Sequence, residues 1–232
     1  TKLCGMITDW GKTYEAVMLL GKTTDTQDIS GSVLSVSEVN ADERKIIDVI
    51  ISFVGGYEQV PPMYSALKHN GKKLYELARQ GIEVERKSRH VDIGFIKINE
   101  MNLNDDEKTV RFTVACSKGT YIRVLCEDIA TKLGTVGLMQ NLRRIRVDKF
   151  DIKDACTLEN LDKAKIISIE ECFKDIPKIN LDDKKTMLFL NGVKLKEDLE
   201  NGIYSIYNNS KYLGLGVIDN KNLKRDVIII DN

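Results

Sequence analysis

The alternation of apolar and polar side chains predicts most of the strands in the first two thirds of the chain. Residues 12–20 are predicted to form a strand in which the even-numbered side chains, from Tyr14 to Leu20, share one face. A short strand is expected at 32–36. The stretches 91–99 and 108–116 alternate well enough to form a hairpin through the polar residues 102–106.

Helical spacing appears in two longer stretches. Residues 42–54 place apolar side chains on one face and end at Gly55-Gly56, which predicts an amphipathic helix. The second helix follows a turn signal at 117–119, with Thr120 as the expected N-cap and Gly134 as the stop. A strand therefore passes into a helix near Arg123, and we expect function to be located there.

The last part of the chain has a smaller, β-rich pattern. Helical stretches at 158–165 and 168–173 lead to Pro177, which we take as the domain boundary. Asn191-Gly192 and Asn201-Gly202 are typical of hairpin turns, and strands are expected at 203–207, 212–218 and 227–230. The prediction is a larger domain at 1–176 and a small one at 177–232.

Composition indicates a globular chain and excludes few classes of function. The 232 residues are 42% hydrophobic, and 35 Lys and Arg balance 35 Asp and Glu, so a nucleic-acid signal has to be local. Five cysteines form no CxxC pair, which argues against a disulfide framework or a zinc site. No apolar run approaches the ~18 residues of a membrane span.

A locally basic insertion is expected at about 57–90. Between Tyr64 and Arg79 the sequence contains the cations Lys68, Lys72 and Lys73 and only one acidic residue, Glu76, with tyrosines interspersed. This pattern is typical of an RNA-facing loop, and an ordinary solvated helix at 74–79 is the alternative. Farther along, Arg143, Arg144 and Arg146 form either one charged face of a strand or an edge that contacts phosphates.

Arg123 needs a compensating anion, because the first turn of a helix disfavours positive charge by roughly 0.3 to 1 kcal/mol. Helix geometry alone favours Glu127, one turn later. The other candidates are a buried carboxylate or a nucleic-acid phosphate. The polar loop 21–31 could close Asx turns with its own side chains, and a calcium site is not expected there, since Val36 stands where a ligand Glu would be needed.

Several ordered motifs resemble one known family. They are the loop 21–31, Pro62-Met63-Tyr64-Ser65-Ala66-Leu67-Lys68, the stretch 71–81, Ser117-Lys118-Gly119-Thr120-Tyr121-Ile122-Arg123, and Leu142-Arg143-Arg144. Together they resemble the bacterial TruB family of tRNA pseudouridine-55 synthases. The resemblance implies an α+β fold: a catalytic domain with a mixed or antiparallel sheet, followed by a small β-rich PUA-like RNA-binding domain.

The resemblance also implies a reaction and roles for particular residues. Such isomerases flip a uridine out of the T-loop of tRNA, break its glycosidic bond with the help of an aspartate, and rejoin the base through carbon. Tyr14 matches the tyrosine that stacks on the base, Tyr121 and Leu142 match residues lining the pocket, and Arg123 matches the arginine that pairs with the catalytic carboxylate. Asp28 is expected to be a second, alternating partner for the same guanidinium, since its loop follows the Tyr14 strand.

Further expectations concern partners and location. Lys68, Lys72 and Lys73 are expected to contact phosphates of the tRNA T-arm, as are Arg143 and Arg144. The family resemblance implies a cytoplasmic enzyme, and we expect no metal, no organic cofactor, no membrane and no obligatory protein partner.

The sequence departs from the family pattern at the nucleophile. The family aspartate lies in a Gly-x-Leu-Asp-Pro-type motif, and no Asp-Pro dipeptide occurs among the 232 residues. The opening Thr1-Lys2 resembles the segment just after that motif, so we expect the missing part upstream and the chain as given to be inactive. A non-catalytic tRNA-binding or folding protein is the alternative; an enzyme acting on free nucleosides is disfavoured by the basic insertion.

Overall fold

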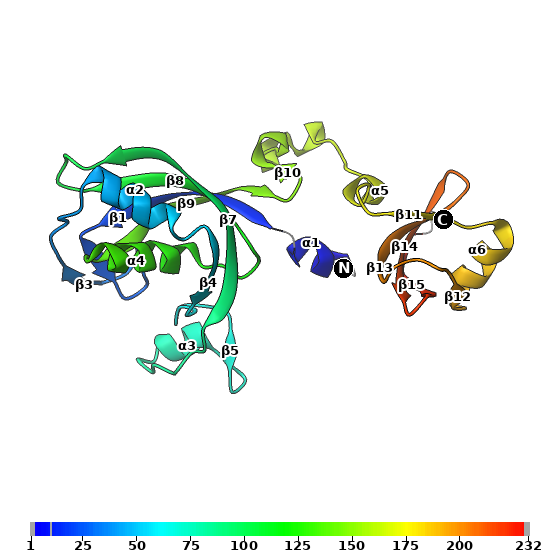
Figure 1. The fold of residues 1–232 in the computed structure, drawn as a ribbon, viewed down its shortest axis with the longest axis horizontal. Helices are drawn as coiled ribbons and strands as arrows, with labels where there is room; N and C mark the ends of the chain where they lie inside the picture. Colours follow the sequence, from blue (N-terminus) through cyan, green and yellow to red (C-terminus); the bar gives the residue numbers. More distant parts are fainter. Residues whose placement is uncertain (1–2, 10, 230–232) are drawn as a thin grey trace. The chain divides into compact units, whose positions relative to one another are not determined.

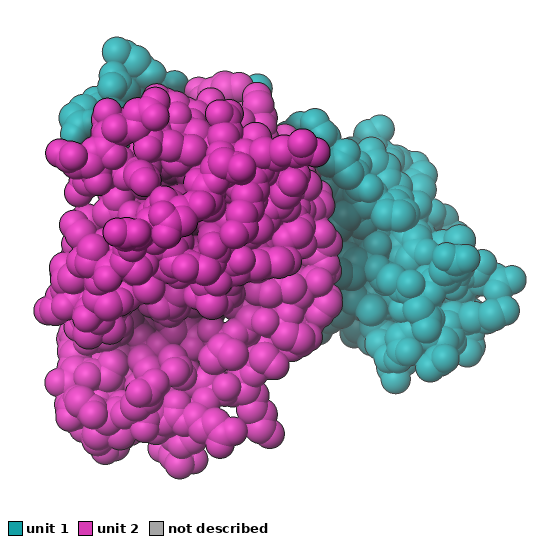
Figure 2. Space-filling model, turned by 60° about the vertical axis from the view of Figure 1, so that its left-hand side comes forward, with its two compact units in different colours: residues 1–5, 156–232 teal, residues 6–155 magenta. Residues whose placement is uncertain are grey.

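The computed structural model describes residues 3–9 and 11–229 (Figure 1). The chain divides into two compact units, one of residues 6–155 and one of residues 1–5 and 156–232 (Figure 2). This division falls after residue 155. The predicted domain boundary at Pro177 precedes the sheet of the smaller unit by one residue, and it stays a prediction.

The larger unit is built on an antiparallel sheet. Within the described residues its strand order is β10-β9-β1-β8-β7-β4, and every pairing is antiparallel. The strands are β1 (Lys12–Leu20), β4 (Gly55–Gln59), β7 (Arg89–Asn102), β8 (Thr109–Cys116), β9 (Gly137–Val147) and β10 (Phe150–Asp151). The predicted strand at 12–20 and the predicted hairpin are therefore confirmed, the latter with a longer first strand.

Two helices cover one face of this sheet. Helix α2 (Glu43–Ile51) and helix α4 (Ile122–Leu133) share one hydrophobic core with β1, β7 and β8 (Figure 1). Phe112 at the centre of β8 is fully buried, as are Ile46 and Leu125 on the helices. The opposite face of the sheet carries exposed polar side chains such as Lys97 and Arg111.

The ends of α4 correct one prediction and confirm another. Gly134 ends the helix in the left-handed conformation at φ 82°, as expected. The N-cap, however, is Tyr121 and not Thr120. The Thr120 hydroxyl donates to the Ser117 carbonyl at 2.9 Å, so it closes the preceding turn and is not available to cap the helix.

Small elements lie between these strands. The predicted loop 21–31 begins with a strand, β2 (Lys22–Thr24), which pairs with β3 (Val33–Val36). The segment between β4 and β7 contains β5 (Lys68–His69), β6 (Lys72–Lys73) and α3 (Leu74–Ala78), and it extends beyond the end of the sheet in Figure 1. The described chain also contains α1 (Cys4–Asp9), the 3₁₀ helices η1 (Ile152–Asp154) and η2 (Leu158–Lys163), and α5 (Ile169–Cys172).

The smaller unit contains a sheet of order β11-β13-β14-β15-β12, counted over its described residues. Its elements are β11 (Lys178–Asn180), α6 (Asp183–Leu190), β12 (Leu195–Lys196), β13 (Gly202–Asn208), β14 (Lys211–Asp219) and β15 (Asn222–Ile228). The predicted β-rich character is confirmed. Helix α6 was not predicted.

Both hairpin signals in this unit were misinterpreted. Asn191 is the C-cap of α6, and Gly192 follows it at φ 82°, so the pair ends a helix. Asn201-Gly202 stands at the start of β13, whose first residue is Gly202, and β13 pairs with β14 and not with the strand before it. An Asn-Gly pair supplies a left-handed residue, which a helix end can use as well as a hairpin.

Among residues 3–9 and 11–229, no helix is both long and apolar enough to cross a membrane.

Candidate active site and RNA-binding surface

Arg123 lies in the first turn of α4, where its guanidinium is held by oxygens from two distant segments. Nη2 donates to the Tyr64 carbonyl at 2.7 Å, and Nη1 donates to the Thr26 carbonyl at 3.3 Å. Nη1 also lies 3.4 Å from Asp28 Oδ2. Because the side chain is only 22% exposed, these acceptors fix its direction.

Asp28 is oriented by its own loop, as the Asx-turn interpretation expects. Its Oδ1 accepts from the Thr26 hydroxyl at 2.8 Å and from the Ser30 N–H at 3.1 Å. Burial raises the pKa of Asp28, but the hydrogen bonds from Ser30 and Thr26 and the charge of Arg123 outweigh it, and the net pKa is lowered. The carboxylate is thus kept ionised with Oδ2 turned to the guanidinium.

Glu127, favoured on helix geometry as the partner of Arg123, has a different partner. The Gln27 amide donates to Glu127 Oε2. Burial raises the pKa of Glu127. Gln27 adopts φ 63° at the turn of the loop, so this contact helps to fasten the loop that presents Asp28. Helical spacing does not reveal the contact between Gln27 and Glu127, because these residues are 100 positions apart in the sequence.

Tyr14 and Leu142 lie on the face of the sheet that α4 covers. In the register of β1 and β9, Tyr14 stands opposite Arg144 and Ala16 stands opposite Leu142. The Arg144 guanidinium carbon is 5.5 Å from the centre of the Tyr14 ring. One face of this ring is therefore covered by a cation, while Leu142 stays 39% exposed beside it.

The neighbouring arginines point to the other face. Arg143 stands opposite Glu15, and Arg146 stands opposite Thr13, both outward positions of β1. A register shift between Thr13 and Tyr14 inserts an extra residue into β9, so that Arg144 and Arg146 fall on different faces. Of the predicted pair Arg143 and Arg144, only Arg144 shares the face of Tyr14.

Strand β9 contacts both the loop that carries Asp28, beside Arg123, and the strand that carries Tyr14. The loop carrying Asp28 pairs with Met139 through hydrogen bonds from Ile29 N–H and to the Gln27 carbonyl, each 3.0 Å. No hydrogen bond or ion pair joins Arg123 to Tyr14 or Leu142 within the described chain. Strand β9 thus links the arginine site to the tyrosine, which the spacing along the sequence did not reveal.

Tyr121 lies at the start of α4, and its backbone is held by a residue that the sequence analysis did not single out. Gln59, at the end of β4, accepts from Tyr121 N–H at 2.8 Å and donates to its carbonyl at 3.1 Å. Gln59 is 1% exposed. A glutamine just before Pro61-Pro62 carries no motif of its own, so only the fold reveals this contact.

The three predicted phosphate-binding lysines lie together on one small hairpin. Lys68 pairs with Lys73 and His69 pairs with Lys72, around a turn in which Asn70 and Gly71 have positive φ. Like charges directly opposite each other are destabilising without a counter-ion. Beyond the hairpin, the centre of the Tyr75 ring is 5.5 Å from the Lys73 ammonium and 5.4 Å from the Arg79 guanidinium carbon.

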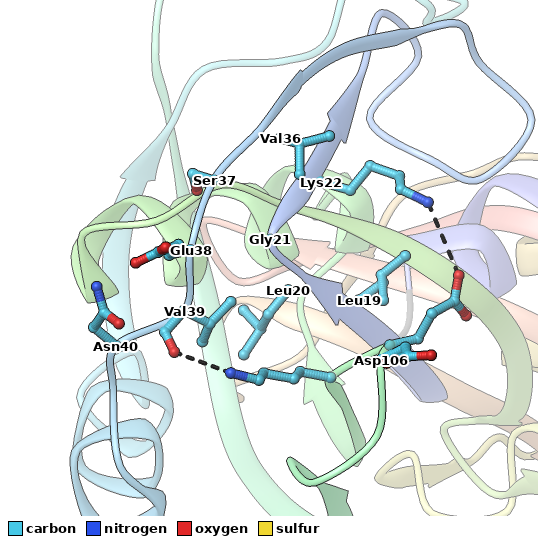
Figure 3. Close-up of a pocket in the computed structure, with 12 residues that line it drawn as sticks. Leu19, Leu20, Gly21, Lys22, Val36, Ser37, Glu38, Val39, Asn40 and Asp106 are labelled. Carbon is cyan, nitrogen blue, oxygen red and sulfur yellow. Dashed lines mark hydrogen bonds and ion pairs between the residues drawn. The ribbon is translucent and has the colours of Figure 1, made fainter.

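A separate pocket of about 430 Å³ lies at the other end of β1, and none of the predicted site residues lines it (Figure 3). Both of its lysines have partners within the pocket wall. Lys22 lies 3.9 Å from Glu107, and the Lys108 ammonium donates to the Val39 carbonyl at 3.2 Å (Figure 3). The lysines of this pocket are thus already held by its own walls. Among the described residues, no group of three or more His, Cys, Asp and Glu side chains could hold a metal.

Comparison with known proteins identifies the family. Residues 1–122 match the family described as "TruB family pseudouridylate synthase (N terminal domain)", and residues 123–183 match "tRNA pseudouridylate synthase B C-terminal domain". The chain belongs to the TruB family. The resemblance carried by the sequence motifs is thereby confirmed.

Relatives in the TruB family cover nearly all of the chain. The chain is 43% identical to a tRNA pseudouridine synthase B from Clostridium acetobutylicum, over 97% of this chain and 80% of the relative. It is 42% identical to one from Clostridium perfringens, over 100% of this chain and 82% of the relative.

Solved structures share the fold. One is a structure of an H/ACA RNP bound to a substrate RNA containing 2′-deoxyuridine, with a TM-score of 0.66 at 19% identity, covering 100% of this chain and 69% of that one. Another is a Cbf5-Nop10-Gar1 complex, with a TM-score of 0.62 at 22% identity, covering 96% of this chain and 66% of that one. The predicted α+β fold with an antiparallel sheet and a β-rich end is confirmed.

Proposed function

We propose that this TruB-family chain provides the uridine pocket and the tRNA-binding surface of a tRNA pseudouridine synthase acting on the T-loop uridine at position 55. Its curated relatives are named tRNA pseudouridine synthase B. The observation that carries the proposal is the Arg123 guanidinium, fixed by Tyr64, Thr26 and Asp28 at the start of the helix that also bears Tyr121.

In the proposed reaction the uracil N1–C1′ bond breaks, the base turns, and a C5–C1′ bond forms; C5 loses its proton and N1 takes one up, so atoms and oxidation state are conserved. Arg123 pairs with the catalytic carboxylate by charge-assisted hydrogen bonds and keeps it ionised and oriented. The contact between Asp28 Oδ2 and Arg123 Nη1 is long, at 3.4 Å. Asp28 therefore yields part of this contact when the catalytic carboxylate approaches Arg123.

Tyr14 and Leu142 hold the extruded base. Flipping costs a few kcal/mol of stacking, and an aromatic face recovers part of it. Arg144 already covers one face of the Tyr14 ring at 5.5 Å, so we propose that uracil stacks on the opposite face, against Tyr121 and Leu142. Arg144 then remains as a cation beside the phosphate of the flipped nucleotide.

The lysine hairpin, together with the predicted small domain at 177–232, binds the T-arm. Lys68, Lys72 and Lys73 lie on a two-strand hairpin with like charges opposed, an arrangement that a phosphate backbone relieves. Binding of a T-arm stem-loop, compared with a stem-loop of scrambled loop sequence at equal charge, tests this part. Equal affinity for both would contradict recognition of the T-loop.

We further propose that the 232 residues alone do not form pseudouridine, because they contain no Asp-Pro dipeptide of the family's nucleophile motif. The test is incubation of the purified chain with unmodified tRNA, followed by carbodiimide labelling and primer extension. A stop at position 55 would overturn the assignment of the nucleophile. Tight tRNA binding without a stop is the expected result.

A second candidate function, a non-catalytic tRNA-binding or folding protein, is favoured by the same missing dipeptide. The codons ahead of residue 1 in the gene distinguish the two candidates. An Asp-Pro motif in frame there supports the enzyme, and a start codon adjacent to residue 1 supports the binding protein.

A further inference from the structure

Strand β4 ends in a buried glutamine, Gln59, that forms hydrogen bonds with Tyr121, the N-cap residue of α4. Gln59 Oε1 accepts from Tyr121 N–H at 2.8 Å, and Gln59 Nε2 donates to the Tyr121 carbonyl at 3.1 Å. The same carbonyl accepts the first helical hydrogen bond, from Leu125 N–H at 3.0 Å. Since the Tyr121 side chain makes no capping hydrogen bond, the Gln59 amide is the side chain that holds the backbone of the N-cap residue.

A chain of hydrogen bonds fixes which way this amide is turned. The Tyr57 hydroxyl donates to Asp128 Oδ2 at 3.2 Å, and Gln59 Nε2 donates to the Tyr57 hydroxyl oxygen. A phenol has one proton, so a hydroxyl that donates to Asp128 offers only a lone pair to Gln59. The amide nitrogen must therefore face Tyr57, which leaves Oε1 for the Tyr121 N–H.

The same short stretch of chain also holds the guanidinium of Arg123. Tyr64, five residues after Gln59, provides the carbonyl that accepts from Arg123 Nη2 at 2.7 Å. Arg123 itself follows Tyr121 by two residues in α4. Residues 59–64 thus set both the backbone from which Arg123 projects and the direction of its side chain.

Building on the proposed function, we propose that Gln59 is a positioning residue for the uridine pocket. It does not touch the substrate; it holds the Tyr121 backbone so that the Tyr121 ring and the Arg123 guanidinium stay in place for the flipped base. The entry of the uridine into the pocket then depends on β4, the strand at the base of the RNA-binding insertion.

Loss of the Gln59 amide has a local consequence. Without it, the Tyr121 N–H and one lone pair of its carbonyl lose their partner in a part-buried position, and a polar group that is shielded from water and unpaired is costly. The start of α4 is then free to shift or unwind by a turn, which displaces Arg123. The lysine hairpin does not take part in these contacts, so overall affinity for RNA is expected to persist.

The experiment uses the 232-residue chain and a T-arm stem-loop with 5-fluorouridine at the target position. Fluorine NMR of the bound stem-loop reports whether the base sits in the pocket, and fluorescence anisotropy of the labelled stem-loop reports overall affinity. In Gln59→Met, which keeps the length of the side chain, the pocket-bound signal is expected to fall roughly tenfold, while overall affinity changes less than about threefold.

Two further variants keep the test decisive. Ser205→Ala removes a hydrogen bond at another site that is 1% exposed, in the smaller unit, and is expected to leave the pocket signal unchanged. Tyr57→Phe keeps both contacts to Tyr121 but removes the hydroxyl that orients the amide, and the signal is expected to fall severalfold. If Gln59→Met does not fold, the pocket-bound signal of Tyr57→Phe tests the positioning role of Gln59 instead.

The outcomes separate this inference from the proposed function. If the unaltered chain binds the stem-loop but shows no pocket-bound signal, the proposed uridine pocket is wrong. If the unaltered chain shows the signal and Gln59→Met, or Tyr57→Phe in its place, retains it in full, the positioning role of Gln59 is overturned. An equal loss of affinity and signal in Gln59→Met and Ser205→Ala would likewise reduce Gln59 to a general contribution to folding.

Discussion

Two clusters of cations in the larger unit differ in how they are held. Arg123 is 22% exposed and its donors are committed to two carbonyls and a carboxylate. Lys68 and Lys72 are exposed on a two-strand hairpin where Lys68 faces Lys73. Arg123 is placed before any ligand arrives, whereas we propose that the exposed lysines gain their main partner only when RNA binds.

This difference matches the two tasks that an RNA-modifying enzyme must combine. Orienting a reactive carboxylate requires a guanidinium held to within a fraction of an ångström. Attracting a polyanion requires charge near the surface and tolerates motion. The predictions below test whether the two clusters behave as a fixed and an adaptable site.

The largest effect is expected from Arg123→Lys. An ammonium cannot reach three acceptors in the geometry of a guanidinium fork, so the part-buried Tyr64 and Thr26 carbonyls lose their donor. The free energy of unfolding should fall by roughly 2 kcal/mol, measured by urea denaturation. The pocket-bound fluorine signal should vanish as well. Wild-type stability together with an unchanged signal would show that the guanidinium is not a fixed part of the pocket.

The double variant Lys68→Ala/Lys73→Ala should have the next largest effect, on RNA binding alone. Affinity for the T-arm stem-loop should fall about tenfold at low salt, and the slope of log affinity against log salt should flatten by about 1 to 2. Stability should stay the same or rise slightly, because a like-charge pair is removed. An unchanged salt slope would mean that these lysines do not contact phosphates.

A smaller effect concerns the buried polar network behind Arg123. Burial raises the pKa of Asp128 to about 6, with Glu127 adding to the rise and the Tyr57 hydrogen bond opposing it. Because the folded state then binds this proton more tightly than the unfolded state, the contribution of Asp128 to stability is largest below the unfolded pKa near 3.8 and falls as pH rises to about 6.

The variant Asp128→Asn checks this pH dependence. Solvent screening of the partly exposed carboxyl reduces the expected loss to about 1 kcal/mol between the two pKa values. Urea denaturation at several pH values should show this decline in the unaltered chain and a flatter profile in the variant. An identical profile in both would assign the pH dependence to another group.

The smallest expected effect distinguishes the two faces of β9. Arg144 shares the face of Tyr14, and Arg143 points to the other face opposite Glu15. Arg144→Ala should weaken binding of the stem-loop a few-fold, and Arg143→Ala, its matched control, should change it less. The reverse order, measured by anisotropy at equal salt, would place the RNA on the outer face of the sheet.

Strands and helices with a strong period were predictable from the sequence. Strand β1 has the predicted bounds, and α4 ends at Gly134 as expected, because apolar periodicity and a left-handed glycine act locally. The turn and cap motifs of the sequence predicted structure less reliably. Thr120 and Asn191-Gly192 were assigned the wrong role, since the same residues suit a turn or a helix end and only the neighbouring elements decide between them.

The sequence by itself determined the family, the residue types of the site and the basic character of the insertion, because motifs and local charge need no fold to be recognised. Only the tertiary structure decided that Glu127 binds Gln27 and not Arg123, that Gln59 holds Tyr121, and that Arg143 and Arg144 face opposite ways. These facts depend on contacts between residues far apart in the chain and on a register shift in β9, and neither leaves a periodic trace in the sequence.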